Sequence, residues 1–304
     1  MIRPQGFPPL PPEFEYDTEV VESTDGEHGI FLNWFKKRSG TPKRALLIIH
    51  GQGEHGGRYQ HFPHYLKDQY DVILAPDLRG HGRSEGIRGH VDSFDEYVDD
   101  ALLAWETLVT RMPAGVECDW FGHSMGATIT LRAFHYRAAI SAHNIILSAP
   151  CLQLSVQVPL IKDLAAKLLV HVWGALALDT GLRADRLSHD PAVVTNVRTD
   201  QLNHTKATSR FYLSFQETME DIRTSELRLP GSIRLLMQLA GEDEIVSTPA
   251  AERYFEGQLH AEHKRIICYP GLYHEIYNEL TKEHVFEDFI AFVKAGVTHE
   301  RTKD

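Results

Sequence analysis

The chain has 304 residues, 42% of them hydrophobic, which is enough for one large α/β core plus an insertion. Its 31 Lys and Arg residues against 42 Asp and Glu residues give a net charge of −11, and no run rich in Lys or Arg occurs. This charge balance argues against nucleic acid as a partner and against adsorption to an anionic membrane through bulk charge.

Three cysteines, an odd number, are spread through the chain as Cys118, Cys151 and Cys268. Two of them fall in stretches expected to form buried strands, so we interpret all three as reduced packing residues rather than a disulfide framework or a metal site. Residues 1–14 are rich in proline and lack the apolar run of a signal peptide. No stretch reaches the roughly 18 apolar residues of a membrane-spanning helix. The sequence therefore predicts a cytoplasmic protein.

Strands and helices are expected to alternate along most of the chain, which is typical of a parallel sheet flanked by helices. In the first half the predicted elements are a hairpin at 15–24 and 30–37, a strand at 44–50, a helix at 59–69, a strand at 71–76, a helix from a capping box at 93–96 to about 112, a strand at 116–121, a helix at 127–134 and a strand at 143–150. Later elements are short helices at 190–194 and 210–215, a strand at 232–239, a helix at 250–255 and a strand at 264–269.

Residues 122–126 read Gly-His-Ser-Met-Gly and match the pattern G-x-S-x-G. The motif lies between a predicted strand and a predicted helix, which is the context that supports a nucleophile elbow. In such a turn Gly122 and Gly126 let the strand and the helix approach closely, because neither has a Cβ atom. The hydroxyl of Ser124 is then held above the edge of the sheet. Ser124 is therefore the candidate nucleophile.

A serine hydroxyl reacts only when a base takes its proton and an acid orients that base. His274 follows the last predicted strand, and the adjacent acids Glu242, Asp243 and Glu244 follow the strand before it. Because ligands bind at the C-terminal ends of parallel strands, His274 is the predicted base. The residues alone leave open which of the three acids is its partner.

An oxyanion hole needs two backbone N–H groups that point at the developing negative charge. One is expected from Met125, the residue after the nucleophile. The other should come from the glycine turn after the strand at 44–50, and we assign it to the N–H of Gln52. The side chain of Gln52 is expected to play no part in this role.

Four segments resemble motifs of the monoacylglycerol lipase and lysophospholipase group of α/β-hydrolases. They are HGQGEHGGRY at 50–59, DLRGHGRSEG at 77–86, GHSMG at 122–126 and YPGLYHE at 269–275. The resemblance covers residues 44–150 and 232–296. It implies the α/β-hydrolase fold, a mostly parallel eight-stranded sheet flanked by helices, with a helical cap inserted.

The same resemblance assigns roles to particular residues. It implies that Asp243 is the acid, because in this group the acid lies a few residues into the turn after the penultimate strand. It also implies that Glu54 and Arg58 lie near the polar end of the substrate pocket. Their i,i+4 spacing suits an ordinary helical ion pair as well, and we favour that structural role.

One long insertion interrupts the predicted alternation of strands and helices. We expect residues 151–228 to form the cap and residues 1–150 and 229–304 to form the core. From Leu160 to Leu176, apolar residues recur at helical spacing. This wide stripe can pack on the body of the protein, or part of it can line an acyl tunnel, in which case Leu164 and Leu168 contact the substrate.

The predicted activity is hydrolysis of the acyl ester of a single-chain lipid, a monoacylglycerol or a lysophospholipid, without a cofactor. Alternatives are a small-ester carboxylesterase, a peptidase or an acyltransferase on the same residues, or a non-catalytic receptor on the hydrolase scaffold. Contact of the cap with a membrane surface would make the protein peripheral. No metal is expected, because no HExxH or CxxC pattern accompanies the clustered histidines His50, His55, His61, His64 and His81.

Overall fold

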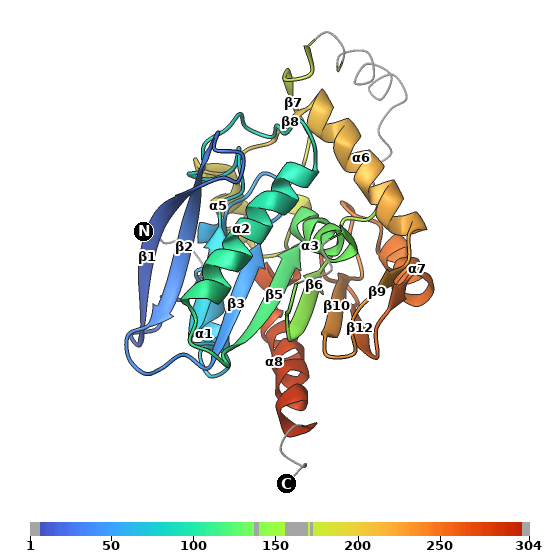
Figure 1. Cartoon of the computed structure of the whole chain (residues 1–304). Coiled ribbons are helices and arrows are strands. Elements are labelled where there is room, and N and C mark those ends of the chain that lie inside the picture. The colour runs from blue at the N-terminus through green and yellow to red at the C-terminus, as the bar shows by residue number, and fades with distance from the viewer. Residues whose placement is uncertain (1–6, 137–139, 156–169, 171–172, 300–304) are drawn as a thin grey trace.

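A single eight-stranded sheet forms the centre of the molecule (Figure 1), in a computed structural model that describes residues 7–136, 140–155, 170 and 173–299. In chain order its strands are β1 (Phe14–Glu22), β2 (Gly29–Lys37), β3 (Arg44–Ile49), β4 (Val72–Pro76), β5 (Glu117–His123), β6 (Asn144–Ser148), β10 (Arg234–Ala240) and β12 (His263–Tyr269). Across the sheet the order is β1-β2-β4-β3-β5-β6-β10-β12. β2 runs antiparallel to β1 and β4, and all other neighbours are parallel. The predicted mostly parallel sheet is confirmed.

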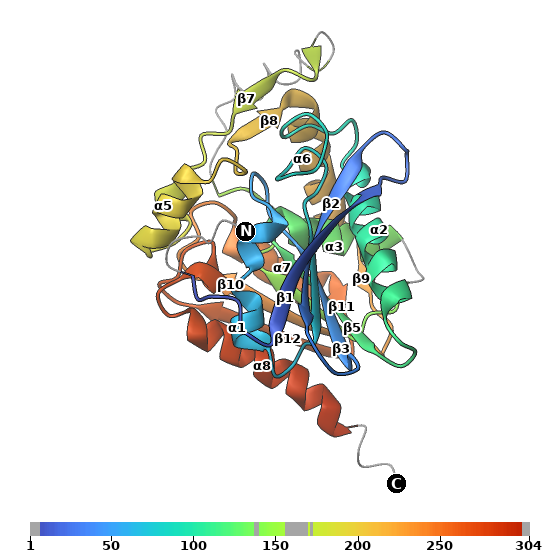
Figure 2. The ribbon, with the colours of Figure 1, turned by 90° about the vertical axis from the view of Figure 1, so that its left-hand side faces the viewer.

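Helices cover both faces of the sheet (Figures 1 and 2). The first face carries α1 (Phe62–Leu66) and α8 (Lys282–His299), and the second carries α2 (Asp95–Arg111), α3 (Met125–Tyr136) and α7 (Thr248–Gly257). The central strand β3 shows why two layers are needed, since its side chains alternate between the faces. Leu46 and Ile48 pack under α1 and α8, whereas Ala45, Leu47 and Ile49 pack under α2 and α3. Both faces of this strand are therefore buried.

Two expectations about local structure were wrong. The helix predicted at 59–69 is replaced by a 3-10 turn, η1 (Gly56–Tyr59), followed by the short α1. Pro63 lies in the first turn of α1, where its missing N–H is no loss, so the helix begins there. Cys268 is exposed rather than buried, because β12 is the edge strand of the sheet. Cys118 and Cys151 are buried free thiols, as expected.

The insertion between β6 and β10 contains more than helices. Its described elements are β7 (Ala177–Asp179), η2 (Ala184–Arg186), α5 (Pro191–Thr199), β8 (Lys206–Thr208), α6 (Ser209–Thr224) and β9 (Leu227–Arg228). β7 pairs with β8, and β9 pairs with β11 (Leu259–His260). Figure 2 shows β7 and β8 lying beyond one end of the sheet. The helices expected at 190–194 and 210–215 are present as α5 and α6.

One apolar face of α6 joins the core on the α2 and α3 side of the sheet, through Phe211, Phe215 and Met219. Most of the stripe from Leu160 to Leu176, including Leu164 and Leu168, lies outside the described residues. Over the part of the chain that is described, no helix combines the length and the apolar character needed to cross a membrane.

Candidate active site

Ser124 lies in the tight turn between β5 and α3, with a φ of 54°. This left-handed conformation is strained for a residue with a side chain. The flanking glycines leave no space for a side chain: a Cβ on Gly126 would come within 2.1 Å of the carbonyl oxygen of Ile49, and one on Gly122 within 2.6 Å of that of Gly126. Close packing of strand and helix around the turn thus requires glycine on both sides of the serine.

His274 contacts both Ser124 and Asp243. Its Nε2 atom lies 2.9 Å from Ser124 Oγ, and its Nδ1 atom lies 2.7 Å from Asp243 Oδ2. Since the carboxylate accepts a hydrogen bond, Nδ1 carries the proton and Nε2 offers its lone pair to the serine hydroxyl. The structure therefore brings together three residues that are widely separated in the sequence, in an arrangement suited to removing the serine proton.

The turn after β10 distinguishes among the three adjacent acids. The side chain of Asp243 is fully buried, and its Oδ1 accepts hydrogen bonds from the N–H groups of Ile245 and Val246 at 2.8 and 2.9 Å. Glu242 and Glu244 are exposed, and Glu244 pairs with Arg186. Asp243 alone of the three touches His274.

Burial and charge act in opposite directions on this pair. Burial raises the pKa of Asp243, but His274 and the two backbone N–H groups outweigh it, so this pKa lies below its ordinary value. Burial likewise lowers the pKa of His274, yet the Asp243 carboxylate raises it above its ordinary value. An ionised Asp243 therefore stabilises the protonated form of His274.

Within the described residues, two backbone N–H groups near Ser124, those of Met125 and Gln52, have no hydrogen-bond acceptor. Met125 is the first residue of α3, so its N–H is one of the four that a helix leaves without an intrahelical partner. The N–H of Gly51 donates to Glu54 Oε1 at 2.6 Å, whereas no hydrogen bond from the N–H of Gln52 is found in the described part of the chain. The loop runs against the nucleophile, since a Cβ on Gly51 would lie 3.2 Å from Ser124 Cβ.

Glu54 and Arg58 belong to a buried ion network. Arg58 donates to Glu54 Oε2 at 2.7 Å, and it binds the two carboxylate oxygens of Glu275 at 2.8 and 2.7 Å. Glu54 also accepts from the hydroxyl of Tyr59 at 2.9 Å. Glu54 precedes η1, so the pair does not lie on an α-helix as the spacing suggested. Glu275 was not predicted as a site residue, although it directly follows His274 in the YPGLYHE motif.

A cavity of about 10 Å³ adjoins this network and is lined by Glu54, Arg58, Glu275, His123 and Asn278, among others. A space of this size holds a single water molecule. Glu54 and Arg58 are also almost completely buried. Their position therefore favours a supporting role behind Ser124 and His274.

The clustered histidines make different contacts, although the rings of His50 and His81 are neighbours, with centroids 5.2 Å apart. The Nε2 atom of His50 accepts from the N–H of Leu78 at 3.0 Å. His61 lies between two backbone carbonyls, and His64 is exposed. His55 contacts the carboxylate of Asp200, and His81 contacts the side-chain amide of Gln52. The expected absence of a metal stays a prediction.

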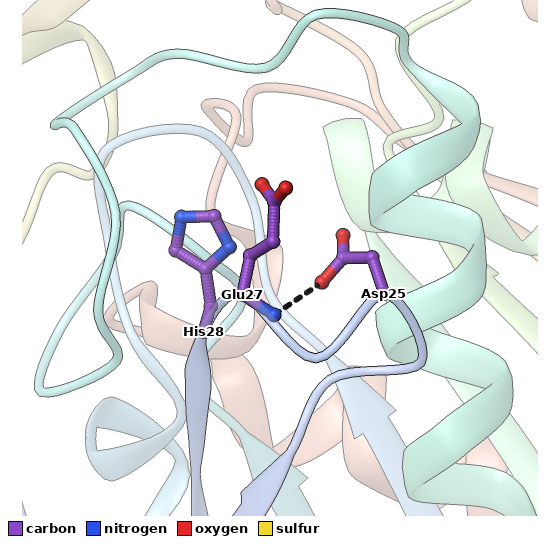
Figure 3. Close-up of side chains that lie close together, drawn as sticks. All are labelled: Asp25, Glu27 and His28. Atoms are coloured by element: carbon purple, nitrogen blue, oxygen red, sulfur yellow. Dashed lines mark hydrogen bonds between the residues drawn. The ribbon is translucent and has the colours of Figure 1, made fainter.

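Among the described residues, one group places three metal-ligating atoms within 4.8 Å of one another, namely Asp25, Glu27 and His28. Figure 3 shows them close together in the turn between β1 and β2. Asp25 already accepts from the N–H of Glu27 at 3.0 Å and pairs with Arg79 at 2.7 Å. These contacts explain the position of Asp25 as a turn stabiliser.

A family model described as serine aminopeptidase, S33, matches residues 40–281. The chain belongs to this family. It is 32% identical over 254 residues to phospholipase YtpA of Bacillus subtilis, covering 83% of this chain and 95% of that protein. It is 28% identical over 284 residues to monoglyceride lipase of Mus musculus, covering 93% of this chain and 91% of that one.

The fold has close counterparts among solved structures. The crystal structure of the monoacylglycerol lipase of Paleococcus ferrophilus matches with a TM-score of 0.75 and 26% identity, and covers 93% of this chain and 99% of that one. The resemblance drawn from the four motifs is thereby confirmed. The chain is an enzyme, a serine hydrolase with the α/β-hydrolase fold, and is related to the monoacylglycerol lipase group.

Proposed function

We propose that this enzyme hydrolyses the acyl ester of a single-chain lipid, a monoacylglycerol or a lysophospholipid. The observation that carries the proposal is the position of His274, 2.9 Å from Ser124 Oγ and 2.7 Å from Asp243 Oδ2. The lipid substrate is supported by the relatives, which are named a phospholipase and a monoglyceride lipase.

In the proposed mechanism Ser124 Oγ attacks the ester carbonyl while His274 Nε2 takes the serine proton. The carbonyl oxygen becomes an oxyanion held by the N–H groups of Gln52 and Met125. His274 then gives its proton to the departing alcohol, which leaves an acyl-enzyme. Water, deprotonated by His274, attacks that ester and releases the fatty acid and free Ser124. Asp243 orients His274 and stabilises its cationic form throughout.

We further propose that residues 151–228 act as a cap over a core made of residues 1–150 and 229–304. The apolar stripe from Leu160 to Leu176 would supply the lining for one acyl chain, with Leu164 and Leu168 in contact with it. Glu54 and Arg58 support the polar side of the site from behind. A cap of this kind admits one chain more readily than several, which favours monoacyl lipids over triacyl lipids.

The cap is also proposed to touch a membrane surface while the enzyme resides in the cytoplasm. Trp173 and Leu178 support this, because 64% and 48% of their surfaces are exposed although both residues are large and apolar. Tryptophan favours the interface between water and lipid. Co-sedimentation with lipid vesicles should be weaker for Trp173→Ser than for the wild type, and equal binding would refute the contact.

The central experiment is covalent labelling combined with substitution of the nucleophile. A fluorophosphonate probe should attach to Ser124 and stop ester turnover. Ser124→Ala should fold normally, as judged by circular dichroism, take up no probe, and lose at least ~10³-fold in kcat. Turnover near that of the wild type in this variant would remove Ser124 from the mechanism.

The description of the matching family favours one alternative, an aminopeptidase on the same three residues. Parallel assays of aminoacyl p-nitroanilides and of monoacyl esters separate the two activities. We expect ester turnover and no measurable release of p-nitroaniline, and the reverse pattern would favour the peptidase.

A further inference from the structure

Three contacts join the loop Gln52–His55 to the segment Asp200–Lys206 of the insertion. The N–H of His204 donates to the carbonyl oxygen of Gly53 at 2.8 Å. The side-chain Nε2 of Gln52 donates to the carbonyl oxygen of Lys206 at 2.9 Å. The Nε2 of His55 lies 3.0 Å from Asp200 Oδ2. We call these three contacts the clasp.

Both the nitrogen and the oxygen of the Gln52 side-chain amide make hydrogen bonds. The carbonyl of Lys206 can only accept, so the NH₂ group of Gln52 faces it. The amide oxygen of Gln52 then faces His81, whose Nε2 lies 3.1 Å away. His81 comes from the loop after β4, so Gln52 bridges the core and the insertion. The side chain thus makes structural contacts of its own, whereas the sequence predicted no part for it in the oxyanion role.

The other two contacts of the clasp are tightly packed and largely buried. Gly53 has a φ of 76°, and a Cβ there would lie 2.1 Å from the carbonyl oxygen of His204. The side chains of His55 and Asp200 are 6% and 19% exposed. Burial raises the pKa of Asp200, but hydrogen bonds from His55 and the N–H of Leu202 bring it below its ordinary value. Asp200 is thus ionised at neutral pH and accepts a hydrogen bond from the His55 ring.

We propose that the clasp positions the N–H of Gln52 for oxyanion stabilisation, so that the Gln52 side chain and Asp200 are positioning residues for the reaction. The inference rests on the proposed function and deepens it. An oxyanion hole works because its donors are fixed before the reaction begins, and a shift of about 1 Å can cost about 100-fold in rate. The insertion therefore contributes to the chemical step itself, besides covering the acyl chain.

This proposal differs in its consequences from a simple closing role. If the clasp only held the cap over the acyl pocket, its loss would slow long-chain esters and leave an acetyl ester untouched. If it positions the Gln52 N–H, turnover of both esters falls by the same factor, because every ester forms the same oxyanion. Binding of the ground-state ester should change little.

The test compares Gln52→Leu and Asp200→Asn with wild type, using p-nitrophenyl acetate and a p-nitrophenyl ester of a long fatty acid. Gln52→Leu keeps the backbone N–H and loses both side-chain hydrogen bonds. Asp200→Asn removes the negative charge of the group that accepts from His55. We expect kcat to fall about 10- to 100-fold on both esters, with KM within about threefold of wild type.

A methyl trifluoromethyl ketone supplies a second readout. Ser124 Oγ adds to its carbonyl carbon, the serine proton passes to His274, and the ketone oxygen becomes an anion at the position proposed for the oxyanion. Its inhibition constant should rise in both variants by about the factor lost in kcat, since transition-state analogues depend on the same donors. A purely structural defect in the cap would not move it.

Two matched controls make the same chemical changes away from the clasp. Gln153→Leu removes an exposed glutamine whose side chain accepts from Arg223 at 3.2 Å. Asp17→Asn alters an exposed residue of β1 whose carboxylate pairs with Lys36 at 2.8 Å. Neither residue contacts the loop Gln52–His55, so both variants should retain wild-type kinetics and the wild-type inhibition constant.

Several outcomes would overturn the proposal. Wild-type turnover of the acetyl ester by both clasp variants, or a loss confined to the long-chain ester, would show that the clasp does not position the oxyanion donor. Thermal unfolding identifies a misfolded variant, and Asp200→Asn decides the matter if Gln52→Leu does not fold. Absence of ester turnover in the wild-type enzyme would instead refute the proposed function.

Discussion

Arg58 and Glu275 are joined by two parallel hydrogen bonds of 2.8 and 2.7 Å, although 217 residues separate them in the sequence. Arg58 belongs to η1, which follows the loop of the proposed oxyanion donor, and Glu275 directly follows His274. The pair thus ties together two loops that reach the sheet edge from different strands. Because it also holds Glu54, one guanidinium serves two buried carboxylates.

Replacing Arg58 should destabilise the protein strongly. Arg58→Met leaves Glu54 and Glu275 buried without their cation, and loss of one partner of a buried ion pair costs about 3–5 kcal/mol. Chemical denaturation measures the free energy of unfolding. Arg228→Met, which removes an exposed pair with Glu226, should cost less than about 1 kcal/mol. Similar losses in the two variants would contradict the role assigned to the network.

Asp243 should be the only acid of its turn that the reaction needs. Asp243→Asn keeps the shape of the side chain but removes the charge that supports protonated His274, so kcat should fall by ~10³ to 10⁴. Glu242→Gln and Glu244→Gln, at exposed positions, should stay within about tenfold of wild type. Steady-state kinetics on one ester substrate measures these effects. A large loss of kcat in Glu242→Gln instead would mean that Glu242, and not Asp243, is the acid that supports His274.

The activity should depend on pH through His274. Its pKa stands above the ordinary value of 6.5, and only the neutral ring can accept the proton of Ser124. The kcat/KM should therefore rise with pH around a midpoint above 6.5. Burial, together with His274, lowers the pKa of His123 to about 4, so that residue stays neutral in this range. In Asp243→Asn the midpoint of the residual activity should move to lower pH, and an unchanged midpoint would contradict the pairing.

Acyl-chain length should govern specificity. If the apolar stripe lines the acyl chain, each buried CH₂ contributes up to ~0.8 kcal/mol to transition-state binding. The kcat/KM should then rise steeply from acetyl to medium and long monoacyl esters. Leu168→Glu or Leu169→Glu should flatten that rise and spare the acetyl ester. A flat or falling profile in the wild-type enzyme would favour a small-ester carboxylesterase.

Those parts of the molecule that rest on local patterns could be predicted from the sequence. Gly-His-Ser-Met-Gly between a strand and a helix indicated the turn at Ser124, and the position of His274 after the last strand indicated the base. The choice of Asp243 over its neighbours needed the family resemblance, because three adjacent acids in a turn have the same local signal. Its contact with His274 depends on how two separate turns meet.

The remainder depends on contacts that no local pattern records. Glu275 lies next to His274, but its partner Arg58 is distant in the sequence. No local sequence pattern therefore predicts this ion pair. The Gln52 side chain donates to the carbonyl of Lys206. That residue lies in an insertion that lacks the regular alternation of strands and helices, so its position could not be predicted. The exposure of Cys268 depends on β12 being an edge strand, which hydrophobic patterning does not reveal.

The crowding at Gly53 limits how freely the insertion could be exchanged for that of another hydrolase. A carbonyl of the insertion passes so close to Gly53 that no Cβ fits there, and the adjacent N–H of His204 bonds back to the same residue. A grafted lid would have to reproduce this backbone approach as well as its own lipid-binding surface. Chimeras that take only the helices of another hydrolase's insertion should fold but have low activity, because the contact at Gly53 is missing. Chimeras that keep residues 200–206 of this chain should be better starting points for changing the substrate range.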